Sequence, residues 1–429
     1  MIRLSPRRSA LTLLTVLAAA LASACNEQLD AGSACPSLCP GLTVPIQDTV
    51  LSPILAYDTT LVGFPSIGSE EGIPLAARGD TLDVRGVLRF DTLAQNYVPT
   101  GDTARPIIQV DTAILRLRLN LTQSRLPSWV RFEFFDVDTT ADDNDTGAVL
   151  ARFVPERLVA SRTLTRAEIT DSLIVPLPND WLLAKIQNIS RVRFGIRLVG
   201  SGPVSLRVHS VETGLPAELR YYVSPDTAVH QVVTSLYSQT PVDPATLATE
   251  YRDYAIVARS AFPAAGASVF STGGLPSRRA YLRFNVPSWL LDSTTIVRAT
   301  LQLTQMPQRA YDAGDSITII GQAVAASRLV TDPYRAAQIL IPSGMFVTDS
   351  IRVAPADSGL RTLELNGLLR VWKDATDTTA SSPQRAIVLL QREEGLHGAE
   401  VRFFNARSSA AVRPRLRVSY IPRVNFGVP

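Results

Sequence analysis

The acidic segment 136–147 offers the residue types that a metal ion needs. It contains Asp136, Asp138, Asp142 and Asn144, and Ca²⁺ prefers several oxygen ligands from carboxylates and amides. An EF-hand loop starting at Asp142 would close with Glu at residue 153, which is Phe, so that motif is excluded. We therefore expect either a structural calcium site at these four residues or a solvated hairpin loop rich in Asp and Thr. No other cofactor is predicted.

Five arginines form a second group with binding potential, because they lie in segments where apolar and polar residues alternate: Arg116, Arg118, Arg193, Arg197 and Arg207. Alternate residues of a strand point to opposite faces, so each arginine should project from the polar face of its strand. Guanidinium groups bind carboxylates and sulfates bidentately, so these arginines could bind an anionic polysaccharide. The alternative is that each one pairs with an acidic neighbour.

The remaining motifs point away from catalysis and from nucleic acid. The sequence has no H-E-x-x-H, no G-x-S-x-G and no phosphate-binding glycine loop, and its three histidines are scattered. We predict that the protein is not an enzyme. The 42 basic and 39 acidic residues nearly balance, which argues against a nucleic-acid partner. Residues 1–24 hold three arginines and no acid, so the rest of the chain is formally neutral.

The N-terminus has the features of a bacterial export signal. Arginines precede the apolar run 10–22, and small residues lead to Cys25. Ala22-Ser23-Ala24 suits ordinary signal cleavage, but the segment also resembles a lipobox, with Ala22 where Leu is usual. We predict a signal peptide over 1–24, lipid on Cys25 and a tether over 25–42. Asn26 follows the cysteine, which by resemblance favours the outer membrane, with the protein on its periplasmic or surface side.

Cys35 and Cys39 lie in the predicted tether. If Cys25 carries lipid, these two remain as an even pair in an oxidising compartment, which favours a disulfide. The alternative is two unpaired cysteines. A metal site would need further ligands nearby, and none is present in this part of the sequence.

The sequence after the predicted signal peptide indicates two copies of one β-rich unit. Residues 86–91 resemble 280–285 at an offset of 194, and residues 204–208 match 399–403 at an offset of 195. Period-2 alternation predicts antiparallel strands with one buried face. We expect an all-β fold of two tandem sandwiches, over 43–224 and 225–422, with a tail over 423–429. Short helices near 179–188 and 365–374 are expected to cap the sandwiches.

A family resemblance supports this reading. Residues 280–284 (AYLRF), 299–303 (ATLQL), the Trp-containing helix, 401–407 (VRFFNAR) and 413–420 (RPRLRVSY) follow the order seen in DNRLRE-type domains. The resemblance covers about 250–422 and implies jelly-roll-like β-sandwiches, some of which are carbohydrate-binding modules. Two functions follow as expectations. One is a non-enzymatic lipoprotein with a structural, adhesive or ligand-binding role at the envelope, whose partner is an envelope protein or a polysaccharide. The other is a pair of carbohydrate-binding modules.

Overall fold

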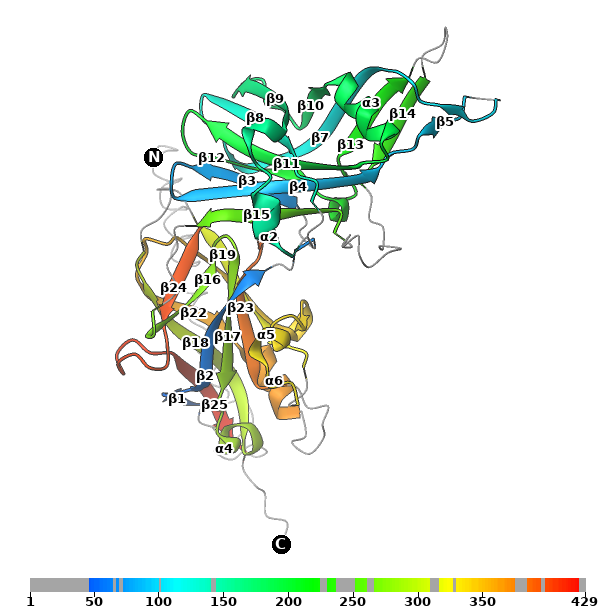
Figure 1. The fold of residues 1–429 in the computed structure, drawn as a ribbon. Coiled ribbons are helices and arrows are strands. Elements are labelled where there is room, and N and C mark those ends of the chain that lie inside the picture. Colours follow the sequence, from blue (N-terminus) through cyan, green and yellow to red (C-terminus); the bar gives the residue numbers. More distant parts are fainter. Residues whose placement is uncertain are drawn as a thin grey trace, which may run out of the picture. The chain divides into compact units, whose positions relative to one another are not determined.

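The chain folds into β-sheets, as described by a computed structural model (Figure 1). The structure describes residues 46–64, 67–68, 72–99, 102–139, 144–223, 230–236, 251–260, 266–308, 316–326, 329–374, 384–394 and 398–423. Residues Asp48–Tyr420 form one compact unit. The described part of the chain has no helix that is long and apolar enough to cross a membrane.

Within the described residues, the first large sheet has eleven strands in the order β14-β13-β7-β12-β3-β4-β11-β8-β9, with β10 also paired to β7 and β15 to β4. Its strands are β3 (Gly72–Arg78), β4 (Leu82–Thr92), β7 (Val110–Arg125), β8 (Trp129–Asp136), β9 (Leu158–Thr165), β10 (Ser172–Leu177), β11 (Arg191–Gly200), β12 (Val204–His209), β13 (Glu218–Val223), β14 (His230–Ser235) and β15 (Asp253–Ser260). A separate ribbon pairs β5 (Asn96–Tyr97) with β6 (Arg105–Pro106).

Among the described residues, the second large sheet has twelve strands in the order β1-β25-β18-β24-β16-β17-β23-β19-β20, with β2 also paired to β17, β21 to β19 and β22 to β18. Its strands are β1 (Gln47–Leu51), β2 (Leu55–Phe64), β16 (Val269–Gly273), β17 (Ser277–Phe284), β18 (Thr294–Met306), β19 (Ile317–Val324), β20 (Leu340–Ile341), β21 (Val347–Val353), β22 (Gly359–Glu364), β23 (Ala386–Gln391), β24 (Glu400–Phe404) and β25 (Arg415–Pro422).

Each sheet closes over its own apolar core, which makes it a sandwich. Strand β7 shows how this happens, because its first half pairs with β10 and β13 while its second half pairs with β12. The alternating residues Leu115, Leu117 and Leu119 are buried in the core, and the arginines between them are only partly buried. Burial of each such side chain contributes about 1.5–3 kcal/mol. The predicted all-β fold of antiparallel sandwiches is confirmed.

The helices are short and lie at the ends of strands: α2 (Thr146–Leu150), α3 (Asn179–Gln187), α4 (Ser288–Asp292), α5 (Pro333–Ala336), α6 (Asn366–Asp374), and the 3₁₀ turns η1 (Pro155–Arg157), η2 (Val211–Thr213) and η4 (Gly344–Phe346). Helices α3 and α6 match the predicted capping helices. Trp372 of α6 is 2% exposed and packs on Phe284 at 5.3 Å between ring centres. Trp181 of α3 packs on Phe194 at 5.4 Å in the same way. Both helices therefore cover the end of a core with an aromatic ring.

Strand pairing departs from the predicted ranges at the N-terminal ends of both copies. Strand β2 pairs along its length with β17 of the second sheet, although the sequence placed it in 43–224. Strand β15 pairs with β4 of the first sheet, although it lies beyond residue 224. The first sandwich thus runs from β3 to β15, and the second contains β16 to β25 closed by β1 and β2. Alternation identifies a strand and its buried face, but it carries no information about which sheet the strand joins.

The two sheets agree in the order of the strands along their main path. Reading both orders from one end, β14 corresponds to β1, β13 to β25, β7 to β18 and β4 to β17. A shared hydrogen bond supports the equivalence: the Asp253 carboxylate accepts from the Val211 N–H, and the Asp58 carboxylate accepts from the Ala406 N–H, both at 3.0 Å. A duplicated unit is expected to keep such a bond.

Candidate functional site

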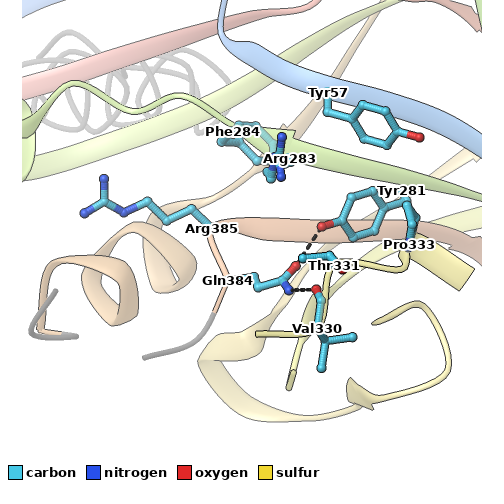
Figure 2. Close-up of a pocket in the computed structure, with 9 residues that line it drawn as sticks. All are labelled: Tyr57, Tyr281, Arg283, Phe284, Val330, Thr331, Pro333, Gln384 and Arg385. Atoms are coloured by element: carbon cyan, nitrogen blue, oxygen red, sulfur yellow. Dashed lines mark hydrogen bonds between the residues drawn. The ribbon is translucent and has the colours of Figure 1, made fainter. Parts of the chain in front are cut away.

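A cavity of about 580 Å³ opens on the second sheet, at a volume typical of small-ligand pockets (Figure 2). We call it the β17 pocket. It is lined by Tyr57, Tyr281, Arg283, Phe284, Val330, Thr331, Pro333, Gln384 and Arg385. Strand β2 supplies the first residue and β17 the next three. The first residue of α5 and the segment before it, together with the segment leading into β23, supply the rest.

The alternation of β17 explains why its tyrosine and arginine reach this pocket. Ala280 and Leu282 belong to the sandwich core, so Tyr281 and Arg283 lie on the opposite face of the strand. Strand β2 runs antiparallel beside them, with Tyr57 in register with Arg283. The rings of Tyr57 and Tyr281 meet edge to face, with centres 6.1 Å apart. The result is an aromatic corner across two strands.

Hydrogen bonds hold the deep side of the pocket. The Tyr281 hydroxyl donates to Oε1 of Gln384 at 2.7 Å, and Nε2 of Gln384 donates to the carbonyl oxygen of Val330 (Figure 2). Burial raises the pKa of the Tyr281 hydroxyl, so this group remains a proton donor at neutral pH. The chain of bonds ties β17 to both loops that complete the pocket.

The open side of the pocket carries positive charge. The guanidinium carbon of Arg283 lies 5.7 Å from the centre of the Tyr57 ring, within cation–π range. Arg283 is exposed, and no described residue gives it a carboxylate partner. The side chain of Arg385 extends away from Tyr57 and Tyr281, and its guanidinium donates to the Val286 carbonyl oxygen at 3.5 Å (Figure 2). The described residues that line the pocket include no carboxylate, histidine or cysteine.

A second cavity of about 450 Å³ adjoins the β17 pocket, because Tyr57 lines both. Asp58, Arg278 and Arg407 also line it. Arg278 forms a buried ion pair with Glu400, whose side chain is fully buried, so this arginine is already neutralised. Tyr57 is 40% exposed and can therefore contact a ligand in either cavity.

The structure does not bring the five predicted arginines into one row. Arg116 and Arg118 lie on β7, where Arg116 is 3.9 Å from Glu218. Arg193 and Arg197 lie on β11: Arg193 is 3% exposed and donates to the Tyr254 hydroxyl, and Arg197 pairs with Glu133 at 2.5 Å. Arg207 lies on β12, in register with Asn120 of β7. The alternative interpretation, that each arginine pairs with an acidic neighbour, therefore holds for Arg116 and Arg197.

Two of the four predicted calcium ligands form ion pairs with basic side chains. Lys185 lies 2.7 Å from the Asp136 carboxylate, and Arg191 lies 3.0 Å from that of Asp138. Asn144 accepts from the Tyr251 hydroxyl at 3.4 Å. Asp142 lies outside the described residues. In the part of the chain that the structure describes, no three His, Cys, Asp or Glu residues are grouped as a metal site requires.

The predicted lipidation site and disulfide also lie outside the described residues, which begin at residue 46. Lipidation of Cys25 and pairing of Cys35 with Cys39 therefore stay predictions.

Sequence reasoning missed the pocket residues, although it singled out the segment that contains two of them. Residues 280–284 carried the family resemblance, yet Tyr281 and Arg283 were not proposed as a site. One sequence signal was available. Neither residue two positions from Arg283 is acidic, so this arginine has no carboxylate on the same face of its strand to pair with. Tyr57 gives no such signal, because its place beside Arg283 depends on a strand pairing across more than 200 residues.

Comparison with known proteins gives no family. No family model matches the chain, and no curated protein matches it. Among solved structures, a nodavirus of Macrobrachium rosenbergii matches with 9% identity over 91% of this chain and 93% of that chain, at a TM-score of 0.17. The VP2 subviral particle of infectious bursal disease virus matches with 10% identity over 86% and 77% of the two chains, at a TM-score of 0.13. Likenesses this weak carry no argument about fold or function.

Proposed function

We propose that this protein is a non-enzymatic lipoprotein of the outer membrane that binds a saccharide at the cell envelope. The lipid is attached at Cys25, and the saccharide binds in the β17 pocket. The observation that carries the binding proposal is the combination of Tyr57, Tyr281 and Arg283 at one open cavity.

The side chains of the pocket suit a sugar ring. The C–H faces of a pyranose pack on aromatic rings, and its hydroxyl groups need donors and acceptors that are already held in place. Tyr57 offers an exposed ring, and Gln384 is fixed by its bonds to Tyr281 and Val330. The resemblance to DNRLRE-type domains, some of which are carbohydrate-binding modules, agrees with this chemistry.

The lining also supports a binding role without catalysis. Its tyrosine and threonine hydroxyl groups have no histidine or carboxylate beside them among the described lining residues. General acid–base or nucleophilic chemistry needs such a neighbour within hydrogen-bond reach. The pocket therefore favours recognition of a saccharide over its cleavage.

The positive charge favours a particular kind of saccharide. Guanidinium groups bind planar carboxylates and sulfates through two hydrogen bonds. With Arg283 at the pocket and no acid among its described lining residues, an acidic polysaccharide is the favoured ligand.

A panel of polysaccharides tests the binding proposal. The purified mature protein should bind at least one member of a set that includes dextran, polygalacturonate and dextran sulfate, measured by calorimetry. Tyr57→Ala should weaken that binding about threefold to tenfold, because aromatic packing contributes about 0.5–1.5 kcal/mol. Trp129→Ala removes an exposed aromatic side chain from the first sheet and serves as the matched control. Absence of binding to every polysaccharide would exclude the proposal.

Membrane fractionation tests the anchor. The full chain should sediment with outer membranes, and Cys25→Ser should release it into the soluble fraction, because the variant cannot carry lipid. An unchanged distribution of the variant would show that another feature holds the protein at the membrane.

A further inference from the structure

Ion pairs between an arginine and an acid two residues away on the same strand recur in the described chain. Their closest nitrogen and oxygen atoms are 2.5–2.8 Å apart, in Arg85–Asp83, Arg89–Asp91, Arg131–Glu133, Arg220–Glu218 and Arg402–Glu400. Side chains at this spacing lie on the same face of a strand. An acid at this position therefore neutralises its arginine locally.

Arg283 departs from this pattern. The residues at the same spacing are Tyr281 and Asn285, and neither carries a charge. The guanidinium instead lies against the Tyr57 ring at the mouth of the β17 pocket, with no carboxylate partner among the described residues.

The first sandwich shows what an acid at this position does. Arg89 of β4 is equivalent to Arg283, because residues 86–91 correspond to 280–285. Nε and Nη2 of Arg89 donate to the two carboxylate oxygens of Asp91, at 2.6 and 2.7 Å. Both side chains are almost fully buried. Asp91, whose backbone has a left-handed φ of 53°, thus occupies the bidentate face of the guanidinium that Arg283 leaves open. The residue at the same sequence position in the second copy is Asn285, which follows the last residue of β17.

The positions of Tyr57 and Tyr281 are not occupied by tyrosines in the first sandwich. Val87 stands at the position of Tyr281, because it lies two residues before Arg89 on β4. Arg252 stands at the position of Tyr57, since the residue after it pairs with Leu88 as Asp58 pairs with Leu282. The two copies have therefore diverged at the same few positions.

We propose that Asn285 determines whether the site is open. A neutral residue at this position leaves Arg283 available for an acidic group of the ligand, whereas an aspartate would place a carboxylate two residues from the guanidinium, where the two can form an internal ion pair. Of the two equivalent arginines, Arg283 of the second sandwich is then open to a ligand, and Arg89 of the first sandwich is held by Asp91. This inference rests on the proposed saccharide binding.

The test introduces the missing acid. Asn285→Asp should weaken binding of polygalacturonate to the full mature protein by at least about tenfold, the loss expected for one charge-assisted hydrogen bond. The substitution keeps the backbone bond from the Asn285 N–H to the Ile54 carbonyl oxygen, so the fold should persist, which melting confirms. Ser288→Asp adds the same charge at an exposed position of α4 and is the control, with binding unchanged.

A double-mutant cycle separates the mechanism from a general effect of charge. Arg283→Gln should weaken binding to a similar extent, and Asn285→Asp should cause no further loss in the Arg283→Gln background. The saturating stoichiometry should be one site per chain. The inference is overturned if Asn285→Asp binds like the wild type, if its effect persists without Arg283, or if two equivalent sites are found. Failure of the wild type to bind any polysaccharide would instead refute the proposed function itself.

Discussion

Strand β2 joins a sandwich that lies more than 200 residues away in the sequence, so a substitution beside it should destabilise the second core and not the first. Ile54 precedes β2, is 1% exposed and belongs to the core of the second sandwich. Ile54→Ala removes three buried carbon atoms and leaves a cavity. Substitutions of this kind cost about 2–5 kcal/mol.

The expected loss of unfolding free energy is large enough to show which sandwich is destabilised. Taking a loss of about 3 kcal/mol and a urea slope of about 2 kcal/mol per molar, the midpoint of the second sandwich should fall by about 1.5 M. Hydrogen exchange by mass spectrometry should accelerate by about a hundredfold in the segments 280–284 and 387–390. Exchange in the segments 115–119 and 194–198 should stay unchanged.

The matched control is Ile256→Ala on β15. Ile256 is 3% exposed and packs with residues of the first sheet, although it lies beyond the predicted boundary at 224. We expect the reverse pattern, with faster exchange confined to the first sandwich. Acceleration of 115–119 by Ile54→Ala, or of 280–284 by Ile256→Ala, would refute the assignment of these strands. Equal acceleration in both sandwiches would refute the independence of the two cores.

Three further predictions concern charged groups. Glu400→Gln should lower the free energy of unfolding by about 3 kcal/mol in a urea titration, because it leaves Arg278 and Arg402 buried without their anion; an unchanged midpoint would contradict this. Burial and two neighbouring arginines hold the pKa of His209 below its ordinary value of 6.5. The contribution of His209 to the stability of the fold is therefore present above pH 6.5, and it is lost as the pH falls through the lowered pKa of the folded state. His209→Gln should therefore flatten the pH dependence of stability below pH 6.5, and an identical acid profile would exclude this role. Millimolar calcium should leave the melting temperature unchanged, because basic side chains already neutralise two carboxylates of the predicted calcium loop, and a rise would show that calcium displaces them.

The pairing of arginines illustrates how far sequence reasoning reached. The formal neutrality of the sequence after residue 24 favoured local compensation, and the structure pairs Arg197 with Glu133 and places Arg116 near Glu218. The sequence could not say which arginines stay open to a ligand, because a guanidinium often pairs across strands. Arg197 and Glu133, for example, are register partners on β11 and β8, 64 residues apart.

The sequence by itself determined the all-β class, the buried faces of strands such as β7 and the two capping helices. These depend on period-2 alternation and on local apolar spacing, which are properties of contiguous residues. Tertiary structure alone decided which sheet receives β2 and β15, and hence that Tyr57 meets Tyr281 and Arg283. Strands pair through backbone N–H and C=O groups, which nearly every residue has, so a strand's own sequence does not select its partner. The partner is selected when the whole sandwich closes over its core, and no single segment of the sequence contains that information.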